Sequence, residues 1–168
     1  GRAGRVRPGH CLKLYTRRML ENSPAHQSPE MHRVPLERLC LMVRSLELGR
    51  PKLFLGQVIE PPNSESVVSA VKHLRELRAF GAKAELTPLG YHLASMPVDA
   101  QIGKMLIYGA ILRCTDQVLT IASAMCTRSP FLKDDTANEA KKKLGGNLMS
   151  DHIVLLRAYD GWISSANR

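Results

Sequence analysis

Apolar side chains recur every three or four residues through most of the chain beyond residue 35, which is the spacing of a single helix face. Each stripe follows a residue that favours the start of a helix, either proline or a side chain able to cap the first turn. The predicted helices begin at Pro35, Ser64, Thr87-Pro88, Asp99, Thr115-Asp116 and Ser150-Asp151, with a further short helix over residues 137–144. We therefore expect a mostly α fold.

Three stretches lack this spacing. Residues 11–15 are a short apolar run that predicts a buried strand, and residues 84–86 predict a second, brief strand. Residues 16–30 are polar and basic, and the prolines at 24 and 29 are expected to break any regular element there, which predicts a linker. Two helices with a short hairpin then suit a winged-helix module (α+β), and the all-helical remainder from residue 99 suits a helical bundle.

Gly109 stands inside the apolar stripe of the helix that begins after Asp99. A glycine within a helix costs about 1 kcal/mol relative to alanine. The compensation we expect is the close approach of a neighbouring helix.

The charge of the chain points to a polyanionic partner. Lys and Arg number 24 against 15 Asp and Glu, a formal net charge of +9, and the excess lies mainly near the N-terminus. Such a balance suggests nucleic acid first. The four cysteines, Cys11, Cys40, Cys114 and Cys126, form no CxxC pair, so neither a zinc site nor a disulfide framework is indicated. No apolar run of the sequence is long enough to span a bilayer.

The first five residues, Gly1-Arg2-Ala3-Gly4-Arg5, hold two arginines three positions apart between small residues. A guanidinium is always charged and presents a rigid fork of donors that fits phosphate oxygens. The glycines let the backbone approach a bulky anion. The two arginines are therefore candidates for holding a phosphate that becomes more negative during a reaction, with a solvated basic loop as the alternative.

This motif resembles the last helicase motif of the DEAH/RHA-type RNA helicases. The resemblance continues in order through the helicase-associated region of that family, at Pro8-Gly9 and at residues 11–16, 35–41, 60–62, 86–90, 97–99, 103–106 and 150–152. Glu60 stands where the family more usually has aspartate. The family's Gln-Arg pair, its Gly-Lys-Thr loop and its Asp-Glu-Ala-His box are not in the sequence. The chain is therefore expected to be a C-terminal piece of a longer polypeptide.

The resemblance implies three parts: the end of a second RecA-like α/β domain with a linker (1–24), a winged helix (25–96) and an incomplete ratchet-like bundle (97–168). It also implies an ATP-dependent RNA helicase that couples NTP hydrolysis to translocation along single-stranded RNA. Arg2 and Arg5 would be arginine fingers toward the γ-phosphate of ATP, with the backbone of Gly1 and Gly4 near the nucleotide. ATP and Mg²⁺ would be bound mainly by an upstream domain, so the piece alone is expected to be inactive.

Three further arginines, Arg17, Arg18 and Arg33, are candidates for contacts with an RNA backbone. A solvated basic surface is the alternative for these arginines, and also for Lys141-Lys142-Lys143. Some relatives in the family are activated by accessory proteins that dock on the winged helix. The expected compartment is the cytoplasm or the nucleus, and the sequence does not choose between them.

Two aromatic residues near the C-terminus, Tyr159 and Trp162, could stack on bases. Their helical spacing with Leu155 favours the alternative that they pack in a core. His152, in the first turn of the last predicted helix, is expected to pack or cap. The acidic pair Asp134-Asp135 lacks a supporting ligand pattern, so no metal site is predicted.

Two other classes of function stay open at this point. One is a non-enzymatic module that binds nucleic acid or protein. The other is a winged-helix DNA binder, although the second predicted helix and its end offer a groove only Lys72, His73, Arg75 and Arg78.

Overall fold

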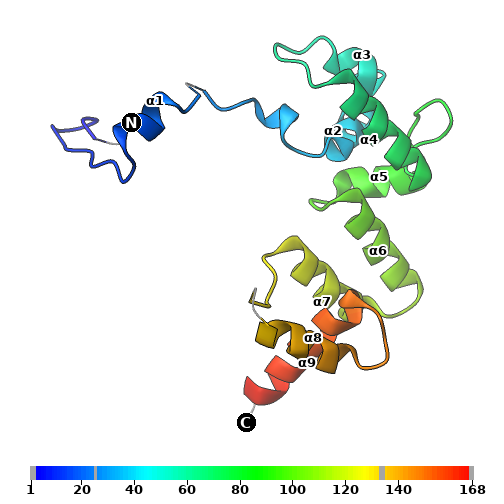
Figure 1. Cartoon of the computed structure of the whole chain (residues 1–168). Coiled ribbons are helices and arrows are strands. Elements are labelled where there is room, and N and C mark those ends of the chain that lie inside the picture. The colour runs from blue at the N-terminus through cyan, green and yellow to red at the C-terminus, as the bar shows by residue number, and fades with distance from the viewer. Residues whose placement is uncertain (1–2, 25, 133–134, 167–168) are drawn as a thin grey trace.

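The computed structural model describes residues 3–24, 26–132 and 135–166, and over these residues the chain is mostly helical (Figure 1). This confirms the predicted fold class. The elements in chain order are α1 (Arg17–Glu21), the 3₁₀ helix η1 (Glu30–His32), α2 (Glu37–Ser45), α3 (Pro51–Leu55), α4 (Ser64–Glu76), α5 (Pro88–Ser95), α6 (Ala100–Ile111), α7 (Thr115–Cys126), α8 (Asp135–Gly145) and α9 (Asp151–Ala166).

The helices pack as two groups that α6 joins (Figure 1). In the first group, α2 contacts α3, α4 and α5; in the second, α7 contacts α6 and α9, and α8 contacts α9. The first group holds the main hydrophobic core, in which Cys40 and Leu74 are fully buried. The segment before α2 reaches away from both groups and is exposed along nearly all of its described length.

The start of α5 follows from its sequence as predicted. Thr87 is the N-cap, its hydroxyl accepts a hydrogen bond from the Gly90 amide at 3.0 Å, and Pro88 occupies the first turn. The cap of α4 differs from the prediction. Asn63, rather than Ser64, is the N-cap residue, and its side chain accepts from the Glu65 amide at 2.9 Å.

Gly90 of α5 lies directly against the carbonyl oxygen of Ala79, which a Cβ atom at position 90 would overlap. The same carbonyl accepts hydrogen bonds from the Thr87 amide and hydroxyl, both at 3.1 Å. The backbone of α5 therefore packs directly against the turn that follows α4.

Both predicted strands are wrong over the described residues. Residues 11–15 form no regular element and are exposed, and the hairpin at 84–86 is reduced to one antiparallel bridge between Phe80 and Leu86. A strand needs a neighbouring backbone to pair with its amides and carbonyls, and an apolar run in the sequence does not supply one. Between α2 and α4 the chain forms the short helix α3, with Pro51 in its first turn.

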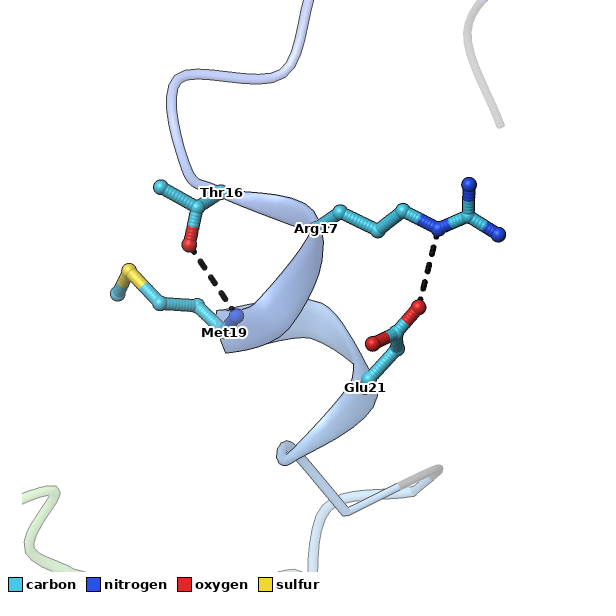
Figure 2. A network of polar contacts seen from close by, with 4 residues as sticks. All are labelled: Thr16, Arg17, Met19 and Glu21. Carbon is cyan, nitrogen blue, oxygen red and sulfur yellow. Dashed lines mark hydrogen bonds and ion pairs between the residues drawn. The ribbon is translucent and has the colours of Figure 1, made fainter.

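The predicted linker contains a short helix, α1, so its prolines do not exclude regular structure. Figure 2 shows how the helix is held: the Thr16 hydroxyl accepts from the Met19 amide at 3.2 Å, and Arg17 Nε lies 3.0 Å from Glu21 Oε1. Both prolines lie beyond its last residue, Glu21, so neither interrupts it.

Gly109 behaves as predicted, because α6 and α7 approach each other closely at this position. A Cβ atom on Gly109 would lie 2.9 Å from Val118 Cβ and 3.0 Å from its Cγ2. Further along the second group, Arg157 Nη1 donates to the carbonyl oxygens of Leu144 and Gly145 at 2.6 and 3.2 Å, which ties α9 to the end of α8.

The thiol of Cys40 is expected to resist alkylation. Burial, with a smaller contribution from the Glu37 carboxylate, raises its pKa from 9.0 to about 12, so thiolate is scarce at neutral pH. At about pH 8, iodoacetamide should modify the exposed Cys11 and Cys126 in the native protein and reach Cys40 only after unfolding. Peptide mass spectrometry measures this, and equal modification of Cys40 and Cys126 would contradict it.

Candidate nucleotide and nucleic-acid interface

The N-terminal arginine motif forms an exposed loop over the residues that the structure describes. Gly4 has φ +79°, in the left-handed region that favours glycine, and the chain returns so that Gly9 lies against Ala3. Arg5 is exposed on this loop. Gly1 and Arg2, the other residues of the predicted site, lie outside the described residues. The loop thus places Arg5 at the surface of the described structure.

The three arginines that follow lie on two different elements. Arg17 and Arg18 are on α1, where Arg17 pairs with Glu21 (Figure 2) while its side chain stays 91% exposed. Arg33 follows η1, and its Nε donates to the carbonyl of Ser28 at 3.1 Å. Surface ion pairs of this kind contribute little to stability. The arginines are therefore exposed cations on the segment that leads from the arginine loop to α2.

The basic face proposed for α4 is smaller than the sequence suggests. Lys72 and Arg75 are exposed, although Lys72 lies 3.9 Å from Glu76. His73 instead points into the fold, with Nδ1 2.9 Å from Glu37 Oε1. His73 is therefore not available to contact a DNA groove, and this weakens the hypothesis that α4 is a DNA-recognition helix.

A groove of about 690 Å³ runs between α7 and α9. The interpretation of Tyr159 and Trp162 as core residues is wrong, because both line this groove with 47% and 62% of their surface exposed. Their rings lie 6.0 Å apart at an angle of 39°. The two apolar stripes that line the groove were visible in the sequence, but their spacing does not reveal whether a further element covers them.

Three candidate residues of the second group, His152, Lys142 and Lys143, lie at its surface. His152 is exposed on α9, and Lys142 and Lys143 are exposed near the end of α8. Lys141 is half-buried, with Nζ 5.2 Å from the centre of the Phe131 ring. The pair Asp134-Asp135 lies outside what the structure describes, apart from the backbone of Asp135 in α8.

The described part of the chain offers neither a cluster of metal ligands nor a helix that could cross a membrane. Residues 3–24, 26–132 and 135–166 contain no group of three His, Cys, Asp or Glu side chains placed to hold a metal ion. Within the same ranges, no helix combines the length and the apolar character needed to cross a bilayer.

Comparison with known proteins gives two family models that match adjacent parts of the chain. The model described as "Helicase associated domain (HA2), winged-helix" matches residues 70–98, and "Helicase associated domain (HA2), ratchet-like" matches residues 99–155. The boundary between them falls at the start of α6.

Curated relatives match along nearly the whole chain. ATP-dependent DNA/RNA helicase DHX36 of Mus musculus is 44% identical over 172 residues, which cover 100% of this chain and 17% of the relative. DExH-box ATP-dependent RNA helicase DExH1 of Arabidopsis thaliana is 45% identical over 96% of this chain and 17% of its own length. ATP-dependent RNA helicase dhx29 of Xenopus laevis is 45% identical over 96% of this chain and 12% of its own length. The chain therefore spans between 12% and 17% of these relatives.

Proposed function

Because this chain belongs to the helicase-associated region of the DEAH-type RNA helicases, we propose that it works as part of an ATP-dependent helicase that couples NTP hydrolysis to movement along single-stranded RNA. The observation that carries the proposal is identity of 44–45% to such helicases along nearly the whole chain. The winged helix and the ratchet-like bundle would help to close the RNA channel beside the motor domains.

In this proposal Arg2 and Arg5 approach the γ-phosphate of ATP as arginine fingers. Guanidinium groups on a glycine-containing loop fit the oxygens of a phosphate, and the exposed residue Arg5 follows Gly4, whose backbone is in the left-handed region. Bound ATP with Mg²⁺ supplies the phosphoanhydride bond that is hydrolysed. In the same proposal, the nucleotide and its metal are held mainly by a RecA-like domain outside this chain.

RNA is the expected polyanionic partner. The net charge of +9 and the exposed cations Arg17, Arg18 and Arg33 support contacts with RNA phosphates. Such contacts raise the binding affinity more at low salt, because binding releases counterions from the RNA. An accessory activator docked on the winged helix, and a place in the cytoplasm or the nucleus, belong to the same proposal.

A chimeric helicase tests the function. The segment of mouse DHX36 that aligns with this chain would be replaced by it, and RNA-stimulated ATP hydrolysis measured against the mouse parent. We expect the chimera to retain its rate within about tenfold, which corresponds to a barrier change of roughly 1.4 kcal/mol.

A parent that lacks the aligned segment is the control and should lose the stimulation by RNA. A chimera that folds and binds RNA but hydrolyses ATP no faster than this control would contradict the proposal. That result would favour the non-enzymatic binding module instead.

A further inference from the structure

Helix α6 belongs to both groups of helices (Figure 1). Its first residue, Ala100, is part of the hydrophobic core of the first group, and Ile107 packs against that core. Two residues later, Gly109 contacts Val118 of α7 in the second group. The match to the ratchet-like model thus begins on a helix whose first two turns are packed in the core of the winged-helix half.

A chain of hydrogen bonds crosses this junction. His73 of α4 lies between Glu37 of α2, whose Oε1 is 2.9 Å from Nδ1, and Gln101 of α6, whose Nε2 is 2.8 Å from the His73 Nε2. A neutral imidazole with its proton on Nδ1 satisfies both contacts, because it donates to the carboxylate and accepts from the amide. Three helices are connected through one ring.

A second contact lies one helical turn further along α6. Lys104 Nζ donates to the carbonyl oxygen of Leu77 at 3.0 Å, and Leu77 is the C-cap of α4. A cation at this position interacts favourably with the negative end of the helix dipole and satisfies a carbonyl that lacks a partner within the helix. Lys104 is half-buried, so water screens this contact less than it would a surface pair.

We propose that Gln101 and Lys104 are positioning residues that form a polar latch, fixing the direction of α6 relative to α4. Apolar packing alone permits helices to slide and rotate against one another. Two directional contacts three residues apart on one helix fix both its rotation about its own axis and its position along that axis. The winged-helix and ratchet-like halves then move as one body, and the boundary between the two family models is not a hinge. This inference goes beyond the proposed function, because it concerns how movement passes through the chain.

The latch can be tested by the distance between two spin labels on this chain. Labels at Ser69→Cys on α4 and Ala110→Cys on α6 occupy exposed positions, after replacement of Cys11, Cys114 and Cys126 by serine. The buried Cys40 stays unlabelled. In the double variant Gln101→Leu, Lys104→Met, we expect the distance distribution to widen roughly twofold, because sliding and rotation of packed helices are then released.

The matched control makes the same two side-chain changes outside the junction, as Gln117→Leu on α7 and Lys142→Met on α8, both at exposed positions. The control should keep the narrow distribution. Arginine at position 104 retains a donor for the Leu77 carbonyl. The variant Gln101→Leu, Lys104→Arg should therefore show a narrower distance distribution than Gln101→Leu, Lys104→Met.

Thermal unfolding followed by circular dichroism separates a loosened junction from a general loss of structure. The exposed Gln101→Leu change alone is expected to keep the melting transition and still widen the distribution. An unchanged width in the folded double variant would overturn the proposal. Equal widening in the control and the double variant would also overturn it.

Discussion

Replacement of Arg5 by alanine in the DHX36 chimera is expected to lower the rate of RNA-stimulated ATP hydrolysis by about 10³-fold. A guanidinium that faces the γ-phosphate stabilises charge that grows in the transition state, and a methyl group supplies none of that stabilisation. The loss should fall on kcat, with KM for ATP little changed, because the contact strengthens only as the reaction proceeds. Steady-state hydrolysis at saturating RNA measures both constants.

Arg7 provides the matched control for this prediction. It is exposed on the same loop two residues further on, and the sequence assigns it no role. Arg7→Ala removes the same charge and should leave kcat within about twofold. Equal losses of kcat in the two variants would show that the loop acts through its overall charge. That result would contradict the role of Arg5 as an arginine finger.

Replacement of Gly90 by alanine is expected to lower the free energy of unfolding by about 2–4 kcal/mol. The new Cβ would overlap the carbonyl oxygen of Ala79, which is backbone and cannot move aside as a flexible side chain can. Displacing this carbonyl would also disturb the hydrogen bonds it accepts from Thr87. Urea unfolding followed by circular dichroism measures the change.

The same substitution at Gly161 serves as the control. Gly161 lies within α9, and a Cβ there would have no atom within 4 Å. Gly161→Ala should therefore stabilise the protein by up to about 1 kcal/mol through helix propensity alone. Similar effects at the two positions would mean that Gly90 does not pack directly against the Ala79 carbonyl.

Much of the helical fold could be predicted because its signals are local. Thr87 and Pro88 start α5 through contacts within four residues, and the stripe interrupted by Gly109 indicated a close helix neighbour that the structure confirms as α7. The arginine motif was also found from the residues alone, since its chemistry resides in side-chain type and spacing. The roles of Arg2 and Arg5 stay predictions.

The errors concern features that depend on distant partners. The apolar run at residues 11–15 has strand character, yet a strand forms only where another backbone completes its hydrogen bonds. The spacing of Tyr159 and Trp162 identified one face of α9 correctly, but not that this face lines an open groove. His73 contacts Glu37, which is 36 positions away in the sequence, and Gln101, which is 28 positions away. No local sequence pattern encodes contacts over such separations.

The sequence by itself determined where most helices begin, the excess of positive charge and the family to which the chain belongs, because caps, periodicity, charge and ordered motifs are properties of neighbouring residues. Only the tertiary structure decided which glycine meets a backbone carbonyl, which aromatic rings stay exposed and which side chains join α4 to α6. Those outcomes depend on how helices far apart in the chain approach one another, and that approach is set by the packing of the whole core.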